Sequence, residues 1–317
     1  VAHMLSLTAI NILSLQLLRR HFHLRSLLKG RLFDDVAVDT IKAGFAALPT
    51  NLVQQIFTDG PPLALNILIP GAAGATASGL YGIARKIASV IQLFRTAFAY
   101  VLAPLASAAT RGAPGDVQAI YAFATRLLTA TVLPLTFVLL SAAAGILHVF
   151  GHGAEAALPA LMILFVARMF ETMSGGAKPV QQAVGGYWRQ LTSSIAGLSV
   201  AVALGVVLTP LYGLTGMAAS VGSGIVTAAV VPLFQLMVHE RLSPFHAPFG
   251  SLLVRALGIS LAAGALGLLV ARIPHPAELV VFVPLLLGSV WCSCRYALPH
   301  DDRLSLGKKT AKKLRLI

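Results

Sequence analysis

Long apolar runs separated by short basic segments dominate the pattern of residues along the chain. The runs cover about 1–18, 38–70, 74–109, 117–149, 156–177, 190–209, 213–238, 252–271 and 277–297. A helix needs about 20 apolar residues to cross a bilayer, whereas a barrel strand shows an alternation over about ten residues. The runs have the length of transmembrane helices and lack the alternation of barrel strands. They predict an all-α polytopic membrane protein with about nine transmembrane helices.

Composition agrees with this class. The chain is 57% hydrophobic and 11% charged, against about 25% charged residues in an ordinary soluble domain. The net charge of +13 would suggest a nucleic-acid partner in a soluble protein. Here the basic residues fall between apolar runs, so we expect membrane lipids as partners and no nucleic acid. Cys292 and Cys294 are too few for a zinc site, and we expect neither a metal nor a cofactor.

The distribution of loop cations predicts the orientation. If residue 1 lies outside, the inner segments are 19–37, 110–116, 178–189, 239–251 and 298–317. These segments, which include Lys178 and Arg189, hold the loop cations, whereas the outer loops hold only Arg272. Positive residues collect on the cytoplasmic side of membrane proteins. The pattern predicts a cytoplasmic C-terminus, a basic amphipathic linker at 19–37 on the inner leaflet, and a basic cytoplasmic tail at 298–317.

The third run carries polar residues on one helical face, which we call the polar stripe. At 100° per residue its members fall within about 60° of one another: Ser78, Tyr81, Arg85, Ser89, Gln92, Thr96 and Tyr100. Arg85 lies about 17 Å from the outer end of the run at 1.5 Å per residue, near the middle of the membrane. Charged residues at this depth are functional candidates. Lys86 and Arg95 flank the stripe and either share its function, pair with a neighbouring helix or snorkel.

The second run supplies a matching polar face. Its members are spaced i, i+4, i+7 and i+8: Asn51, Gln55, Thr58 and Asp59. Two interpretations of Asp59 stay open. It is either a counter-ion for Arg85 or Lys86, or a carboxylate that couples transport to protons or sodium.

The fifth run carries Arg168 and Glu171 at a spacing that permits a pair on one helix face. They either neutralise each other or line a cavity together, with Glu171 labile. No P-loop, G-x-S-x-G or H-E-x-x-H motif occurs in the sequence, so nothing points to ATP hydrolysis or to a standard hydrolase. We expect that the protein is not an enzyme.

Three stretches resemble the second half of polysaccharide flippases of the multidrug/oligosaccharidyl-lipid/polysaccharide (MOP) exporter superfamily. The first, ASGLYGIARKIASVIQLFRTAFAYVLAPLASAATRGAPGD, is similar to a pattern of G-x-Y-x-x-A, a long helix, P-x-x-S and G-D. The second is YAFATRLLTATVLPLTFVLLSAAAGILHVFG, and the third is LTPLYGLTGMAASVGSGIV. The resemblance covers roughly residues 38–240.

This resemblance implies two six-helix bundles around a central cavity that work by alternating access. The implied substrate is a lipid-linked oligosaccharide of the undecaprenyl-pyrophosphate type, flipped from the inner to the outer leaflet of the bacterial cytoplasmic membrane. Partner enzymes would be a polysaccharide polymerase and glycosyltransferases. By position, the substrate-binding candidates are Arg85, Lys86, Arg95, Gln92, Ser89, Tyr81, Asn51, Gln55 and Arg168, and the ion-coupling candidates are Asp59 and Glu171.

The resemblance also implies a domain organisation. Residues 1–18 would be the last helix of a truncated first bundle, and 19–37 the linker. The second six-helix bundle would cover 38–240, followed by two additional transmembrane helices at 241–297. Such transporters have 12 to 14 spans, so we expect the chain, which begins with Val1, to be a fragment that lacks the first spans.

Two alternatives remain. One is a drug or cation antiporter of the same superfamily, for which an acidic and aromatic cavity would be typical. The other is a membrane subunit that binds isoprenoid lipids without transporting them.

Overall fold

The computed structural model describes most of the chain beyond residue 34. The described residues are 35–109, 114–151, 153–184, 187–245, 248–273 and 277–305, with Thr8, Leu13 and Gln16. The chain divides into two compact units, 1–47 and 48–317, and every spatial relationship below lies within the second. Apart from those three positions, the predicted span 1–18 lies outside the described residues, as do 19–34 of the predicted linker and 306–317 of the predicted tail.

Every regular element of the described residues is a helix. The elements are α3 (Asp35–Leu68), α4 (Ala72–Ala109), α5 (Pro114–His148), η1 (Ala154–Ala157), α6 (Leu158–Met173), α7 (Ala177–Ala183), α8 (Tyr187–His239), α9 (Phe249–Val270), α10 (Ala277–Tyr296) and α11 (His300–Ser305). Within the described residues, six helical segments are long and apolar enough to cross a membrane. An all-α polytopic membrane protein is thereby confirmed. α3, which carries the polar face of the second run, is not among the six.

α8 contains two of the predicted spans, because it folds back on itself. It has 53 residues, and a straight helix of that length would be about 80 Å long. Yet Arg189 near its start forms an ion pair with Glu240 just after its end, at 2.6 Å. The reversal lies at Gly213, whose φ of 56° and ψ of −129° are not helical. Only glycine adopts such a conformation readily, which explains why the reversal occurs there.

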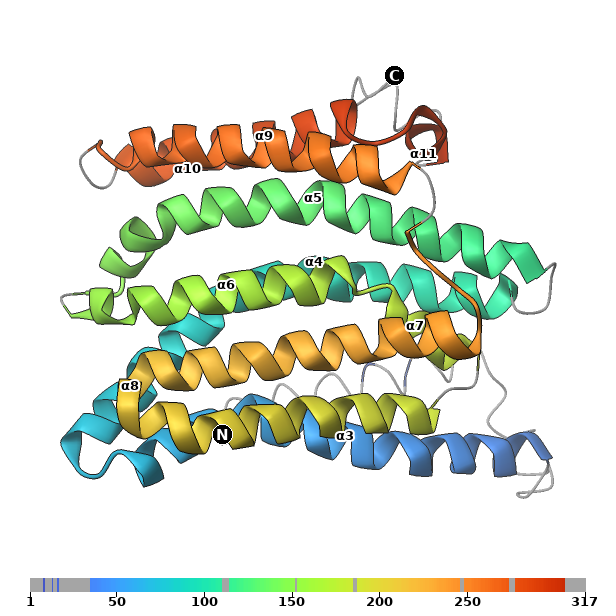
Figure 1. The fold of residues 1–317 in the computed structure, drawn as a ribbon, viewed down its shortest axis with the longest axis horizontal. Coiled ribbons are helices and arrows are strands. Elements are labelled where there is room, and N and C mark those ends of the chain that lie inside the picture. The colour runs from blue at the N-terminus through green and yellow to red at the C-terminus, as the bar shows by residue number, and fades with distance from the viewer. Residues whose placement is uncertain are drawn as a thin grey trace. The chain divides into compact units, whose positions relative to one another are not determined.

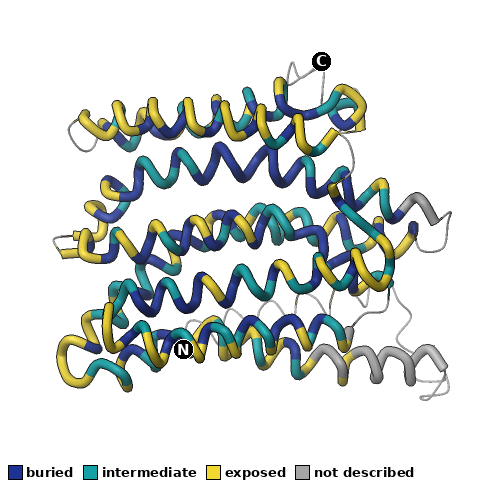
Figure 2. Tube along the Cα trace, in the orientation of Figure 1, coloured by how far each residue is buried: buried dark blue, intermediate teal, exposed yellow. Residues whose placement is uncertain are grey.

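The helices of the second unit pack in layers around α5 (Figure 1). α9 and α10 lie against α5 on one side, α4 and α6 lie on the other, and α8 packs on α6. About two thirds (67%) of the most apolar stretch of α5 is buried, and its trace is largely dark blue in Figure 2. α5 is therefore the central helix. A cavity lies on the side of α4 and α6 away from α5, and its lining comes from α3, α4, α6, α7 and α8.

The fifth run does not end where the sequence pattern predicts. α6 ends at Met173, a turn follows at Ser174, Gly175 and Gly176, and α7 then runs from Ala177 to Ala183. α7 packs on α4 and α8. Residue 178, which the loop pattern assigns to an inner loop, is consequently inside a helix of the bundle. This placement changes the composition of the cavity.

Candidate functional site

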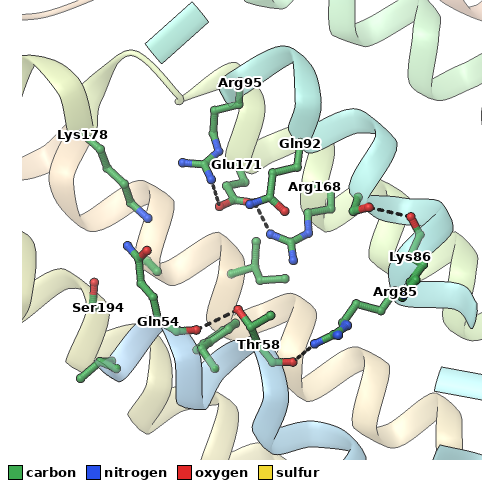
Figure 3. A pocket seen from close by; sticks show the side chains of 15 residues that line it. Gln54, Thr58, Arg85, Lys86, Gln92, Arg95, Arg168, Glu171, Lys178 and Ser194 are labelled. Carbon is green, nitrogen blue, oxygen red and sulfur yellow. Dashed lines mark hydrogen bonds and ion pairs between the residues drawn. The ribbon is translucent and has the colours of Figure 1, made fainter. Parts of the chain in front are cut away.

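A cavity of about 330 Å³ lies between α3, α4, α6, α7 and α8. We call it the cationic pocket (Figure 3). Its charged lining residues are Arg85, Lys86, Arg95, Arg168, Lys178 and Glu171. Five cations and one carboxylate leave a net charge of +4 on the lining. The volume lies at the lower end of the range of about 300–1,000 Å³ that is common for ligand pockets.

α4 supplies most of the cationic wall, and helical periodicity explains why. Arg85, Ser89 and Gln92 are spaced four and three residues apart, so they share one face, and all three line the pocket. The opposite face of α4 carries Ile87 and Ile91, which are buried in the hydrophobic core. Core packing thus fixes the rotation of α4 and turns the polar stripe toward the pocket.

The side chains of Arg95, Arg168 and Lys178 come together around Glu171, and we call these four residues the Glu171 cluster. Arg168 Nη1 donates to Glu171 Oε2 at 2.6 Å, and Arg95 Nη2 lies 3.6 Å from Glu171 Oε1. Lys178 reaches into the pocket from α7 (Figure 3). The Glu171 side chain is only 10% exposed, so the carboxylate at the centre of the cluster is largely buried.

Gly175 positions Arg95 in the Glu171 cluster. A Cβ at this residue would lie 2.7 Å from Arg95 Cγ and 2.8 Å from the carbonyl oxygen of Thr172. The absence of a side chain therefore lets the aliphatic part of Arg95 lie directly against the turn between α6 and α7. The same turn directs the chain into α7 and so brings Lys178 to the pocket.

At the α3 side of the pocket, Arg85 binds two consecutive residues of α3, Thr58 and Asp59. Its Nη1 donates to the carbonyl oxygen of Thr58 and lies 3.2 Å from Asp59 Oδ1. Gln55 donates a hydrogen bond to the same carboxylate from the preceding turn. Asp59 is thus an ion-pair partner of Arg85, which is one of the two interpretations that the sequence leaves open.

The structure brings seven of the predicted site residues together and leaves four outside the pocket. Those that line it are Arg85, Lys86, Ser89, Gln92, Arg95, Arg168 and Glu171. Asn51, Gln55 and Asp59 are exposed residues of α3 that do not line it. Tyr81 is 1% exposed within the main hydrophobic cluster, because α4 packs against η1, α5 and α6. Of the polar stripe, only the middle part, Arg85, Ser89 and Gln92, lines the pocket.

Sequence reasoning missed Lys178, Gln54 and Ser194 as lining residues. Ser194 lies on α8 and shares a helix face with Gln190 and Ser193, a spacing that was not used. The sequence pattern places Lys178 in an inner loop, because the fifth apolar run ends at residue 177. The sequence does contain a signal for a helix here. Gln181 and Gln182 follow Lys178 at i+3 and i+4, so the three polar side chains share one helix face, and a seven-residue helix fits between the glycines at 175–176 and 185–186.

A second cavity, of about 250 Å³, lies between α3 and α8. We call it the apolar groove. Its lining consists of Ile56, Phe57, Gly60, Pro61, Ala64, Leu68, Leu198, Ala201, Val202, Gly205, Val206, Met217 and Val221. Phe57 lines both the groove and the cationic pocket. The two cavities are therefore neighbours along α3, one cationic and one without a polar side chain.

This arrangement is suited to binding an anion whose remaining part is apolar. Arginine and lysine side chains bind phosphate and carboxylate groups through charge-assisted hydrogen bonds. Two buried polar atoms at the pocket, Arg95 Nε and Ser194 Oγ, have no hydrogen-bond partner in the described part of the chain. Buried polar groups are nearly always paired, so these atoms are available to a bound ligand.

Comparison with known proteins gives a distant likeness in structure. No protein-family model matches the chain, and no curated protein matches it in sequence. Two solved structures are similar: a MOP superfamily transporter from Pyrococcus furiosus, and a multidrug resistance MATE family transporter of the MOP superfamily in an outward-facing conformation. Each is 13% identical, with a TM-score of 0.46 over 86% of this chain and 67% of the other. At this level of similarity, neither a family nor a substrate follows for the chain.

Proposed function

We propose that the protein is a membrane transporter of the MOP superfamily that moves a lipid-linked oligosaccharide from the inner to the outer leaflet. The observation that carries this proposal is the excess of cations in the cationic pocket, five against one carboxylate. Each charge within a transmembrane helix costs about 2.5–3.5 kcal/mol on insertion scales. An anionic substrate offsets that cost, and the pyrophosphate of an undecaprenyl-pyrophosphate-linked sugar is such an anion.

The apolar groove supports an amphiphilic substrate. Because Phe57 borders both cavities, a molecule with its phosphates in the cationic pocket can place its isoprenoid chain in the groove. A free anion such as a nucleotide would leave the groove without a role. The two cavities therefore favour a lipid phosphate, and the sugar portion of the proposed substrate comes from the resemblance to polysaccharide flippases.

In this proposal the chain works by alternating access between two bundles, without an enzymatic step. Residues 38–240 form the second bundle, and 241–297 contribute two additional helices. The protein resides in the bacterial cytoplasmic membrane with its C-terminus in the cytoplasm. Glycosyltransferases build the substrate before transport, and a polymerase uses it afterwards.

The charge of the pocket argues against a drug or cation antiporter, because a cationic drug would meet a lining with a net charge of +4. A subunit that binds isoprenoid lipids without moving them would share both cavities. Binding alone therefore does not separate that alternative from a flippase, and the test has to measure movement across the bilayer.

The experiment compares Arg85→Ala with Arg255→Ala, a matched control on α9 whose side chain is exposed. In cells whose only copy of the gene carries the variant, we expect Arg85→Ala to abolish surface polysaccharide at unchanged protein abundance, and Arg255→Ala to preserve it. Normal polysaccharide in the Arg85→Ala strain overturns the proposal.

A second arm uses the full-length protein in liposomes with a fluorescent undecaprenyl-pyrophosphate sugar in the inner leaflet. A flippase exposes the sugar to an external lectin over time. Binding without exposure instead identifies the non-transporting lipid-binding subunit.

A further inference from the structure

The Glu171 cluster combines three cations with one carboxylate, drawn from three helices. Arg95 comes from α4, Arg168 and Glu171 from α6, and Lys178 from α7. The formal charges of these four side chains sum to +2. The other acidic residue near the pocket, Asp59, is paired with Arg85 on the α3 side, so it does not neutralise this cluster.

The donors of the cluster are only partly used. Arg168 makes a direct hydrogen bond with Glu171, but Arg95 lies at 3.6 Å from it and its buried Nε has no partner. Lys178 makes no ion pair or hydrogen bond in the part of the chain that the structure describes. A guanidinium has five N–H donors and an ammonium has three. One carboxylate, which offers two oxygens, cannot satisfy these three side chains.

We infer that Glu171 is a resident counter-anion that occupies the subsite taken by the anionic group of the ligand. It holds Arg95 and Arg168 in place while the pocket is empty. It releases one or both of them when a ligand oxygen replaces its own. This inference rests on the proposed function, because it names the part of the cationic pocket that receives the phosphates.

Charge complementarity supports a dianionic group in this subsite. A pyrophosphate that is esterified at both ends carries about one negative charge on each phosphate, which matches the net charge of +2. Its oxygens can accept from Arg95 Nε, which has no partner among the described residues, and from the Lys178 amine, which lines the same pocket. A monoanionic phospholipid headgroup would leave one of the two net charges unneutralised.

The exchange also explains why a carboxylate occurs in a site for anions. Once the ligand leaves, Glu171 can bind both arginines again, so release does not leave the cations unpaired within the membrane. A site without this carboxylate would bind anions more tightly and release them more slowly. Glu171 is therefore a positioning residue that reduces affinity in favour of turnover.

The test measures inorganic pyrophosphate binding to the full-length protein in nanodiscs, by calorimetry and by the rise in melting temperature at saturating ligand. Glu171→Gln is nearly isosteric and removes the negative charge. We expect it to bind pyrophosphate at least fivefold more tightly and to slow flipping of the lipid-linked sugar several-fold. We expect Arg168→Gln to bind at least tenfold more weakly. Glu155→Gln is the matched control, because Glu155 is exposed in η1 at the other end of the same segment.

Other roles of Glu171 predict different results. If the pair is only structural, Glu171→Gln lowers both the affinity and the ligand-induced rise in melting temperature, and the inference is overturned. If Glu171 couples transport to an ion, the affinity is unchanged and the ion dependence of flipping is lost, which also overturns it. The ligand-induced rise is compared within each variant, so a lower basal melting temperature does not obscure the outcome.

If the Glu171→Gln protein folds poorly, the experiment uses Glu171→Asp instead. This variant keeps the negative charge but shortens the side chain by one methylene. We expect tighter binding there as well, by about threefold, because the shorter side chain holds the arginines less well. Unchanged or weaker binding contradicts the inference. If the unmodified protein binds no pyrophosphate, the proposed function itself fails; if Arg85→Ala abolishes binding but the Glu171 variants do not tighten it, only this inference fails.

Discussion

Arg85 on α4 and Asp59 on α3 form an ion pair in which Nη1 and Oδ1 are 3.2 Å apart. The two side chains are 24% and 52% exposed, and Arg85 also donates to the carbonyl oxygen of Thr58. The arginine therefore has a second partner that stays in place when the carboxylate is removed. Exposed ion pairs contribute about 0–1 kcal/mol, so the pair orients Arg85 more than it stabilises the protein.

The first prediction is that Asp59→Asn keeps at least about half of the flipping rate and lowers the free energy of unfolding by less than about 1 kcal/mol. Asp59 then serves as a counter-ion that the Thr58 carbonyl can partly replace. The rate is measured in liposomes with and without a proton or sodium gradient, with Asp301→Asn on α11 as the control. Loss of the gradient dependence in Asp59→Asn alone would instead identify Asp59 as the coupling carboxylate.

The second prediction concerns Gly175, against which the aliphatic part of Arg95 packs. Gly175→Ala places a methyl group 2.7 Å from Arg95 Cγ and 2.8 Å from a backbone oxygen. Since the backbone cannot yield easily, the Arg95 side chain must shift from its position beside Glu171. We expect roughly tenfold weaker pyrophosphate binding and a loss of about 1–3 kcal/mol in stability, the usual cost of overpacking.

The control for this prediction is Gly258→Ala on α9, where a new Cβ meets no atom within 4 Å. It should leave both binding and melting temperature unchanged. Equal affinities in the Gly175→Ala and unmodified proteins would show that Arg95 does not depend on the close approach at this turn.

Sequence periodicity identified the wall of the pocket that α4 supplies, because Arg85, Ser89 and Gln92 recur at helical spacing on one face of a regular helix. The same reasoning failed at two residues, Tyr81 on α4 and Lys178 on α7. Tyr81 belongs to the stripe by angle, but neighbouring helices cover α4 at this residue. Their positions are not encoded in the periodicity of one helix. Lys178 follows an apolar run and two glycines, a pattern shared by a loop at the membrane surface and a turn within the bundle.

The division of the last part of the bundle was more predictable. The runs 190–209 and 213–238 are separated at Gly213, where the structure has a non-helical backbone and α8 reverses. The backbone conformation at the reversal requires a glycine at that position, and a glycine between two apolar runs can be read directly from the sequence. Contacts between distant residues, such as those of Arg126 with Asp302, are not visible in this way because 176 residues separate the partners.

The third prediction tests the apolar groove as the site of the isoprenoid chain. Val202 on α8 lines the groove and is 56% exposed, so Val202→Phe can fill the groove without disturbing the core. We expect the affinity for undecaprenyl pyrophosphate to fall about tenfold, while that for inorganic pyrophosphate stays the same. Val254→Phe, at a position that is 71% exposed on α9, controls for added bulk in contact with lipid. A parallel loss of both affinities would place the effect in the cationic pocket instead.

The fourth prediction concerns the attachment of α11 to the bundle. Asp302 accepts two bonds from Arg126 on α5, from Nε at 2.5 Å and from Nη2 at 2.8 Å, and the side chains are 9% and 13% exposed. Removing one partner leaves the other charge buried without compensation, which costs about 3–5 kcal/mol. Asp302→Asn should therefore lower the melting temperature clearly, whereas Asp301→Asn, at an exposed neighbouring position, should not.

A double-mutant cycle with Arg126→Gln separates this pair from general effects of the substitutions. If the two residues stabilise the protein through each other, the double variant Arg126→Gln with Asp302→Asn loses less stability than the sum of the two single variants. The double variant removes both charges, so it leaves no unpaired charge buried. Additive costs would mean that each residue stabilises the protein through other contacts. Since the pair lies outside the cationic pocket, pyrophosphate affinity should stay constant throughout the cycle, and a change in it would connect α11 to the site.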